Sequence, residues 1–431
     1  MEMLRAWRRK LQSHFDASSR FKKNFLRVAS ASVFAQALPI LASPIMTRLY
    51  SPHDFGVLAL FVALLGVSVA MATMRFDWLL AAAHTRKAAA HIVVLGVLFV
   101  VLACLAFVGI CFFGLYHEVA FVDWHTLDRF IWLMPVAVLG SGLQTLLSGW
   151  FIRAAHLTPV ARARIRQSLA VVALGLIGGV HALGALGLIA ATVLGTFIGV
   201  GGLFRSARND LALGLAHIRT LSLFAKARSI RRRMLVSGAT GIINVSGLLL
   251  PAIMISHYFS AVELGWYALM QRLATGPVGT VTGAVGQSFW GEARSLSHTD
   301  TRALQTLFER TSSRLALLSI PVAAACLAGP WYVGPIFGRE EWQGAGKVLA
   351  ALTPFVVAQI IAAPLSSVIT IKRHEKWLFF WDLTRTLFVI AVFSVGGYYG
   401  IGLTTAVLWY AIGMAVMYAL LFCKTRRIIC A

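Results

Sequence analysis

The chain has 431 residues, of which 58% are apolar and only 13% are charged, and its mean hydropathy is +0.78. This composition excludes an ordinary soluble domain, in which about a quarter of the residues are charged. The formal net charge of +23 is in the range of nucleic-acid-binding proteins. The basic residues, however, flank long apolar segments, which argues against that class.

The N-terminal arm, residues 1–23, has no apolar core of the length that a cleavable signal peptide needs. It places Leu4, Trp7, Leu11 and Phe15 at helical spacing, with basic residues between them. This pattern predicts an amphipathic helix that lies on the membrane surface. A disordered arm is the alternative.

Apolar runs of about 20 residues predict membrane-spanning helices, because that length matches the hydrocarbon core of a bilayer. We expect about twelve such spans. They cover residues 28–47, 55–80, 91–114, 130–152, 165–181 and 183–204 in the first half, and 234–257, 263–290, 315–337, 348–371, 377–399 and 401–422 in the second. The pair that meets at 181–184 could be one broken helix, but its length favours two spans.

Lys and Arg are divided unequally between the two sets of loops. With a cytoplasmic N-terminus, 31 of the 39 fall in cytoplasmic segments, four in outer loops, and four within or at the edge of spans. This asymmetry follows the positive-inside rule and predicts that both termini are cytoplasmic. The basic loops are expected to contact anionic membrane lipids, and nucleic acid is not an expected partner.

One motif, Ser-x-x-acid-x-Gly, occurs twice between apolar runs. The two copies lie 209 residues apart and consist of Ser51, Asp54 and Gly56, and of Ser260, Glu263 and Gly265. Ser-x-x-acid is typical of a capping box, in which the hydroxyl and the carboxylate each accept a bond from the backbone N–H of the other residue. Each copy therefore predicts a hairpin between two spans, with these residues in structural roles. Its repetition predicts that the chain is duplicated.

A second correspondence, at an offset of 219 residues, aligns Pro135 with Pro354 and Arg166 with Arg385. Each half contains an even number of spans, so both halves run in the same direction and form parallel repeats. We predict an all-α polytopic membrane protein with two pseudo-symmetric six-helix lobes. The expected parts are the arm 1–23, an N-terminal lobe 24–204, a basic cytoplasmic linker 205–233, a C-terminal lobe 234–423 and a cytoplasmic tail 424–431. The linker is expected to be a helix on the membrane surface.

The sequence contains no motif for nucleotide or metal chemistry. No Gly-x-x-x-x-Gly-Lys loop is present, and no loop is long enough to form a nucleotide-binding domain. The five cysteines and twelve histidines show neither metal-ligand spacing nor a plausible outer disulfide pair. We therefore expect no catalytic residues, no metal and no cofactor.

The segment 43–60, SPIMTRLYSPHDFGVLAL, resembles the first-hairpin signature of polysaccharide biosynthesis transporters. These are the O-antigen or exopolysaccharide-unit flippases (Wzx type) of the multidrug/oligosaccharidyl-lipid/polysaccharide exporter superfamily. The basic arm, Asn24 at the start of the first span, and Arg153 and Lys372 at the ends of spans 4 and 10 extend the similarity.

This resemblance implies two six-helix bundles in a V shape, in the inner membrane of a bacterium. The implied activity is the translocation of undecaprenyl-diphosphate-linked oligosaccharides, such as O-antigen, capsule or exopolysaccharide units, from the inner to the outer leaflet. The implied partners are the polyprenyl-diphosphate-linked glycan, membrane lipids, and polymerase and chain-length proteins of the same pathway. The two extra helices of the lipid II flippase branch are not expected.

Charged residues inside the spans are the candidates for a substrate cavity, because a central arginine costs about 2.5–3.5 kcal/mol on insertion scales. Arg272, halfway through span 8, is the clearest case, and its counterpart in the first half is Ala63. Its guanidinium suits a diphosphate or an acidic sugar; the alternative is a structural pair with a carboxylate or carbonyl groups. The other candidates are Arg75, Arg27, Gln271, Gln36, Asn244, Asp77 and Arg385.

Each weaker candidate has a structural alternative. Arg27 is close enough to the headgroups to snorkel. Asp382 and Arg385 are three residues apart and can neutralise each other. Gln36 and Asn244 suit sugar hydroxyls or helix–helix hydrogen bonds equally well.

Arg75 and Asp77 are two residues apart on one predicted helix, so they do not face each other and can reach different partners.

Three other functions are open to a chain of this kind. A cation-coupled drug or metabolite antiporter of the same superfamily is the main alternative, but it needs a carboxylate deep in the membrane, and the first span has none. A lipid-dependent glycosyltransferase needs an acidic base at the outer surface, where Asp54 is explained by the capping box. A scaffold would not need Arg272 inside a span.

Overall fold

The structure is a computed structural model. It describes residues 33–83, 85–113, 124, 126–127, 129–154, 156–215, 220–296, 300–338, 340–372 and 374–430. The predictions for the arm 1–23 and for Arg27 lie outside these residues. The described residues are almost all helical and include no strand.

The first half of the chain forms an N-terminal bundle. Its helices are Val33–Leu49, α2 (Pro52–Thr73), α3 (Phe76–Ala81), α4 (Arg86–Phe112), η2 (Ile131–Leu133), α5 (Met134–Arg153), α6 (Thr158–Val180) and α7 (Ala185–Leu215). The prediction of two spans separated by a tight turn at residues 181–184 is confirmed. Ala182 and Gly184 in that turn have φ of 53° and 54°, which a right-handed helix cannot contain.

The second half forms a C-terminal bundle. Its helices are α8 (Thr220–Tyr258), α9 (Ala261–Leu296), α10 (Thr301–Leu327), α11 (Gly329–Phe337), η3 (Glu340–Trp342), α12 (Gln343–Ala351), α13 (Thr353–Ala362), η4 (Ala363–Leu365), α14 (Ser367–Ile371), α15 (Glu375–Tyr398) and α16 (Leu403–Cys430).

Among the described residues, nine helices are long and apolar enough to cross a membrane, or ten if the bent pair α10–α11 is one span. Helix Val33–Leu49 is shorter, and α9 carries polar residues and glycines in its middle. Each of the twelve predicted spans coincides with one of these helices or with a set of broken helices. The protein is therefore a multi-pass, all-α membrane protein.

Three predicted spans are broken rather than continuous. The span 55–80 divides at Met74 and Arg75, which have φ of 42° and 56° and so cannot continue a right-handed helix. The span 315–337 bends by 63° between α10 and α11, just before Pro330. The span 348–371 consists of the end of α12, then α13, η4 and α14. Pro354 lies in the first turn of α13, and Pro364 lies within η4. Breaks occur at these positions because proline cannot continue a helix without the loss of a hydrogen bond.

The predicted surface helix over residues 205–233 is wrong as a separate element. Residues 205–215 continue α7, and residues 220–233 begin α8. The spans extend beyond their apolar cores because long basic side chains can leave the bilayer while their helix continues.

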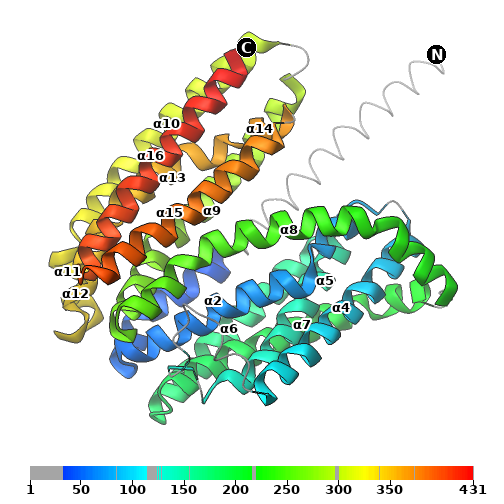
Figure 1. Cartoon of the computed structure of the whole chain (residues 1–431), viewed down its shortest axis with the longest axis horizontal. Coiled ribbons are helices and arrows are strands. Elements are labelled where there is room, and N and C mark those ends of the chain that lie inside the picture. The colour runs from blue at the N-terminus through cyan, green and yellow to red at the C-terminus, as the bar shows by residue number, and fades with distance from the viewer. Residues whose placement is uncertain are drawn as a thin grey trace, which may run out of the picture.

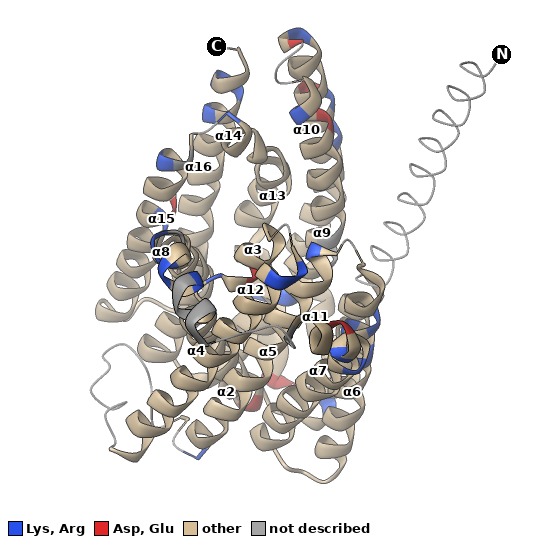
Figure 2. Ribbon diagram, turned by 90° about the vertical axis from the view of Figure 1, so that its right-hand side faces the viewer, with Lys and Arg blue, Asp and Glu red and all other residues tan. Residues whose placement is uncertain are grey.

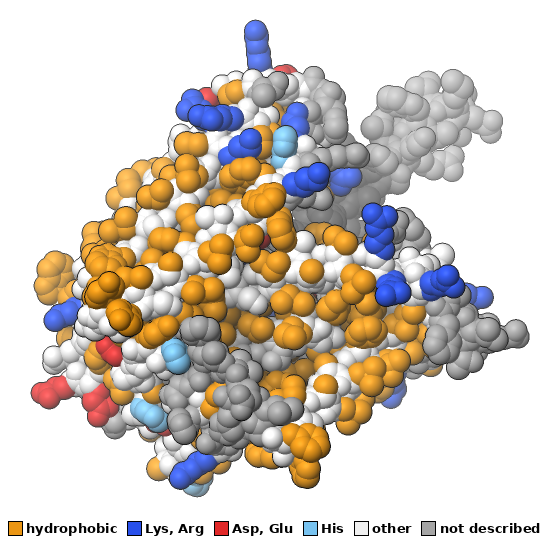
Figure 3. All heavy atoms as spheres, in the orientation of Figure 1, with side chains coloured by type: hydrophobic (Ala, Val, Ile, Leu, Met, Phe, Trp, Pro, Cys, Tyr) orange, Lys and Arg blue, Asp and Glu red, His pale blue; other side chains and the backbone are white. Residues whose placement is uncertain are grey.

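The two bundles meet at one end of the molecule and diverge toward the other (Figure 1). The end where they meet carries the two hairpins and α11–α12, and we name it the hairpin end. The opposite end carries the N-termini of α4 and α15 and the C-termini of α7 and α16, and we name it the basic end. Lys and Arg gather at the basic end, a group of acidic side chains lies at the hairpin end, and an apolar belt separates them (Figures 2 and 3).

Both hairpins form capping boxes. The Ser51 and Asp54 backbone N–H groups donate to the Asp54 carboxylate and the Ser51 hydroxyl, at 3.0 and 3.3 Å. The Ser260 and Glu263 backbone N–H groups make the matching bonds at 3.0 and 3.2 Å. These bonds satisfy N–H groups that would otherwise be unpaired at the starts of α2 and α9.

The third member of each motif joins the bundles. A Cβ atom at Gly56 would overlap the carbonyl oxygen of Ala261, and one at Gly265 would overlap the carbonyl oxygen of Pro52. The two contacts are reciprocal, as expected when repeated hairpins pack against each other about a pseudo-twofold axis. Glycine at these positions thus allows α2 and α9 to touch backbone to backbone.

Aromatic side chains complete the contact at the hairpin end. The ring of Phe55 on α2 packs edge-on against Trp342 of η3, with ring centroids 5.3 Å apart. Trp342 is fully buried. The indole N–H of Trp266 on α9 donates to the carbonyl of Glu341 at 2.8 Å, which fixes η3 in place. The hairpin end is therefore closed.

The charge asymmetry predicts which end is cytoplasmic. Reporter fusions after Lys87, Arg228 and Lys372 should give a cytoplasmic signal, and fusions near Ser260 and Trp342 should give an outside signal. An outside signal at Arg228 would contradict both the orientation and the two-lobe arrangement.

Gly56→Ala and Gly265→Ala should each lower the melting temperature of the purified protein, because overpacking a close contact costs about 1–3 kcal/mol. Gly109→Ala is the matched control, since a Cβ at Gly109 meets open space and alanine favours the helix. Equal stability of Gly56→Ala and Gly109→Ala would show that the α2–α9 contact does not depend on glycine.

Candidate functional site

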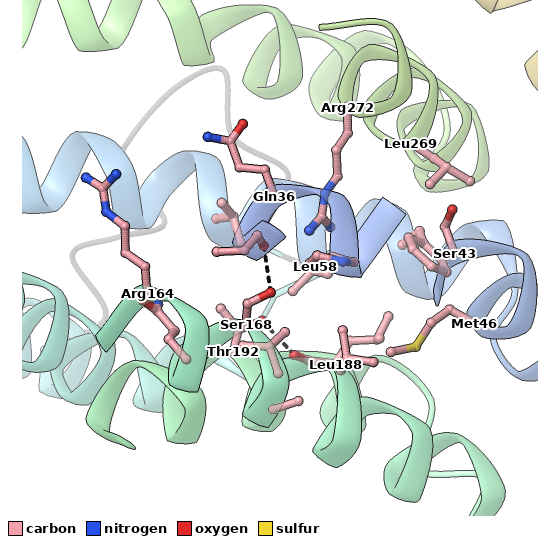
Figure 4. A pocket seen from close by; sticks show the side chains of 18 residues that line it. Gln36, Ser43, Met46, Leu58, Arg164, Ser168, Leu188, Thr192, Leu269 and Arg272 are labelled. Atoms are coloured by element: carbon pink, nitrogen blue, oxygen red, sulfur yellow. Dashed lines mark hydrogen bonds between the residues drawn. The ribbon is translucent and has the colours of Figure 1, made fainter. Parts of the chain in front are cut away.

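A cavity of about 700 Å³ lies where the two bundles face each other. Its walls come from helix Val33–Leu49, α2, α6 and α7 of the N-terminal bundle and from α9 of the C-terminal bundle (Figure 4). Its lining residues include two arginines and no carboxylate; the polar and charged ones are Gln36, Ser43, Arg164, Gln167, Ser168, Thr192 and Arg272.

Arg272 reaches the cavity from α9. Its side chain extends toward Gln36 and Leu58 of the opposite bundle (Figure 4). It lies eleven residues past Ala261, the first residue of α9, or about 16 Å along the helix, which is mid-depth for a hydrocarbon core of about 30 Å. No described residue makes a hydrogen bond or ion pair with its guanidinium.

Arg164 is a second arginine of the cavity, which the sequence reasoning missed. The apolar run predicts a span that begins at residue 165 and so leaves Arg164 outside it, whereas α6 begins at Thr158. Arg164, Gln167 and Ser168 are three and four residues apart and therefore share one face of α6. That spacing was the signal in the sequence that could have identified this wall.

A chain of amides and hydroxyls fixes the α6 wall. The Gln144 side chain donates to the Gln167 carbonyl at 2.6 Å, and Gln167 donates to the Thr196 hydroxyl at 3.1 Å. The Ser168 hydroxyl donates to the backbone carbonyl of Ala35 at 2.7 Å, which holds helix Val33–Leu49 against α6 (Figure 4). These bonds give the polar side chains of the cavity defined positions.

A smaller polar pocket of about 360 Å³ adjoins the cavity and shares Arg164 and Gln167 with it. Asp77 of α3 lines this pocket, not the main cavity. Its other polar lining residues are Gln144, Thr145 and Ser148 of α5. Together the two spaces place a cationic cavity beside a pocket that is rich in hydroxyl and amide groups and contains one carboxylate.

Two predicted cavity residues belong instead to a cluster inside the C-terminal bundle. Asn244 of α8 donates to both Asp382 carboxylate oxygens, at 3.2 and 3.1 Å. Arg385 pairs with Asp382 at 3.0 Å and donates to the Asn244 backbone carbonyl at 3.2 Å. Arg385 is 3% exposed. The placement of Asn244 and Arg385 in the Arg272 cavity is therefore wrong, because their partners lie within their own bundle.

Two further candidates lie apart from the cavity. Arg75 occupies the break between α2 and α3, where its guanidinium lies 4.6 Å from the Trp78 ring and its methylene groups pack on Gly241 of α8. Gln271 is not among the residues that line the cavity. Of the predicted residues that the structure describes, Arg272 and Gln36 line the cavity, and Asp77 lies in the adjoining pocket.

A second hollow, of about 980 Å³, opens toward the basic end. It lies between the second half of α9, with Gly279, Gly283 and Gly286, and η4 and α14, and Leu157 of the N-terminal bundle also contacts it. The space between the bundles is therefore sealed at the hairpin end and open at the basic end. No group of three or more metal-binding side chains occurs among the described residues.

Residues 45–346 match the model of a family described as polysaccharide biosynthesis protein. This match covers well over half of the chain. The chain belongs to this family. The resemblance inferred from the first hairpin is thereby confirmed.

Solved structures of similar fold are transporters of the MOP superfamily. The lipid II flippase MurJ, in an inward closed conformation, has a TM-score of 0.72 at 11% identity and covers 93% of this chain and 87% of its own. An inward-facing multidrug resistance transporter of the MATE family has a TM-score of 0.63 at 16% identity, with 94% of each chain covered. A MOP superfamily transporter from Pyrococcus furiosus has a TM-score of 0.62 at 16% identity and covers 95% of this chain and 96% of its own. These likenesses establish the fold alone.

A comparison with curated proteins finds no matching sequence.

Arg385→Met should destabilise the protein by about 3–5 kcal/mol, because it leaves the partly buried Asp382 carboxylate without its cationic partner. Thermal unfolding in detergent measures the loss. Lys376→Met, an exposed position on α15, is the control, and Asp382→Leu/Arg385→Met should recover much of the stability. A stable Arg385→Met variant would contradict the structural role of this pair.

Proposed function

We propose that the protein is a flippase that moves polyprenyl-diphosphate-linked oligosaccharide units from the inner to the outer leaflet of a bacterial plasma membrane. The observation that carries this proposal is a cavity between two bundles that contains Arg164 and Arg272 and no carboxylate. Membership in the polysaccharide biosynthesis family supports a glycan cargo. The protein acts by alternating access and not as an enzyme.

The two arginines suit the diphosphate of such a cargo. A guanidinium binds phosphate oxygens through two parallel, charge-assisted hydrogen bonds. Arginines at membrane depth normally face a cavity or a partner, because they are costly in hydrocarbon. An anion that enters from the basic end would meet both Arg164 and Arg272, on opposite bundles.

The sugar units would occupy the amide- and hydroxyl-lined space beside the arginines. Gln36 and Thr192 line the cavity, and Gln144, Thr145 and Ser148 line the adjoining pocket. Such groups can donate to and accept from sugar hydroxyls in either direction. The polyprenyl tail would remain in the bilayer, between the diverging bundles.

The contacts at the hairpin end would form the outer gate. In the described state Phe55, Trp342 and the α2–α9 glycines close that end. Release to the outer leaflet requires these contacts to separate while the bundles approach each other at the basic end. With the basic end in the cytoplasm, the described state accepts cargo from the inner leaflet, and both termini lie in the cytoplasm.

A cation-coupled antiporter of the same superfamily is the alternative. It would need a membrane-embedded carboxylate in the cavity to bind its cation. The cavity has none among its lining residues; Asp77 lies in the adjoining pocket that Arg164 also lines, and Asp382 is paired with Arg385. The observed charges therefore favour an anionic cargo.

Arg272→Ala should lower glycan export at least tenfold, because a hydrogen bond to a charged group contributes about 1.5–3 kcal/mol. The variant is expressed in a strain that lacks the native gene, and the leaflet that holds the lipid-linked glycan is measured. We expect accumulation in the inner leaflet with normal amounts of protein in the membrane. Arg272→Lys should also lose most export, since an ammonium group cannot form the two parallel bonds.

Arg302→Ala is the matched control, because Arg302 is an exposed arginine on α10 that does not line the cavity. Wild-type export by Arg272→Ala would exclude the cationic cavity as the cargo site. Unchanged lipid-linked glycan in the strain without the gene would exclude the flippase function itself.

A further inference from the structure

An apolar groove of about 590 Å³ runs along the N-terminal bundle, away from the cavity. It lies between α4, α5 and α7, which pack side by side (Figure 1). All of its lining residues are apolar: Val93, Val94, Val97, Leu143, Leu146, Leu147, Phe197, Val200, Gly201, Phe204 and Leu211. Gly201 and Phe204 are exposed, so the groove opens on the surface.

The dimensions of the groove match a lipid chain. Its α7 wall extends from Phe197 to Leu211, which is about 21 Å of helix and so spans somewhat more than one leaflet of a core about 30 Å thick. An apolar space does not retain water. Because Gly201 and Phe204 are exposed, hydrocarbon chains of the bilayer can enter it at membrane depth.

Basic side chains lie at the end of the groove nearest the basic end. On α7, Phe197, Gly201, Phe204, Arg208 and Leu211 follow one another at steps of three and four, so Arg208 shares the groove face. Arg208 is exposed.

On α4, Arg86 stands two helical turns before Val93 and so lies on the same face. Arg86 also pairs with Asp210 at 2.9 Å, which places the start of α4 beside the end of α7. Lys87 adjoins Arg86 and is exposed. Three cations against one carboxylate leave this end of the groove positive.

We propose that the groove binds one acyl chain of an anionic phospholipid of the bilayer, with the lipid phosphate against Arg86 and Arg208. Basic sites between helices at the cytoplasmic side of membrane proteins are suited to anionic headgroups. The lipid would fill the space between α4 and α7 and hold the outer face of the N-terminal bundle together. This site is independent of the cargo that the central cavity carries.

The test uses native mass spectrometry of the purified protein with added dioleoylphosphatidylglycerol or dioleoylphosphatidylcholine. The wild type should retain one phosphatidylglycerol in preference to phosphatidylcholine. Gly201→Trp should abolish this adduct, because a side chain at Gly201 enters open space and occupies the groove. Gly109→Trp is the matched control: its position is equally open but does not line the groove, so the adduct should persist.

The contact between the lipid headgroup and Arg208 is tested by a substitution at this exposed position, which leaves the packing of the bundle unchanged. Arg208→Gln should weaken phosphatidylglycerol binding about fivefold, the effect of one basic residue near an anionic headgroup. Arg205→Gln, on the flank of the groove face, should leave binding unchanged. Equal retention of both lipids by the wild type, or an unchanged adduct in Gly201→Trp, would overturn the proposal.

Undecaprenyl phosphate is the competing probe. If it displaces phosphatidylglycerol from the wild type, and Gly201→Trp prevents its binding, the groove holds a polyprenyl chain and the proposal is wrong. Retention of phosphatidylglycerol in its presence supports a bilayer phospholipid as the occupant.

Discussion

The backbone contact between α2 and α9 determines how the two bundles are arranged. Gly56 and Gly265 bring the starts of the two helices together at the hairpin end, and the capping boxes next to them fix where each helix begins. Because the contact lies at one end only, the bundles diverge away from it. The cavity between the bundles, into which Arg272 extends, and the separate hollow toward the basic end follow from this divergence (Figures 1 and 4).

The charged residues of the C-terminal bundle interior and those of the cavity between the bundles are arranged differently. In the C-terminal bundle, Asp382 pairs with Arg385 and accepts from Asn244, and Arg385 also donates to the Asn244 carbonyl, so these charges have partners within their own bundle. In the cavity, Arg164 and Arg272 face open space with no carboxylate in the lining. Removing one member of such a pair leaves the other charge without compensation, whereas cations that face a cavity without a carboxylate can attract an anion. This difference separates the structural charges from those available to a ligand.

Features set by local sequence were predictable, and features set by distant partners were not. Helix positions and capping boxes follow from apolar length and the Ser-x-x-acid pattern, and both are present in the structure. The breaks at Met74 and Arg75 have no local signal, since neither residue is glycine or proline. The sequence leaves open whether Asn244 binds sugar or another helix, because its partner, Asp382, is 138 residues away. Arg164 was missed because the apolar core of α6 begins after it, although the helix does not.

The unbalanced arginines of the cavity have an electrical consequence. Moving one elementary charge across a membrane potential of 100 mV involves about 2.3 kcal/mol. In the proposed cycle a bound diphosphate offsets the charge of Arg164 and Arg272, so the loaded bundles rearrange with little electrical work. The empty cavity remains positive, and an interior-negative voltage favours its return toward the cytoplasm. In that cycle the membrane potential would favour the return of the empty carrier after release.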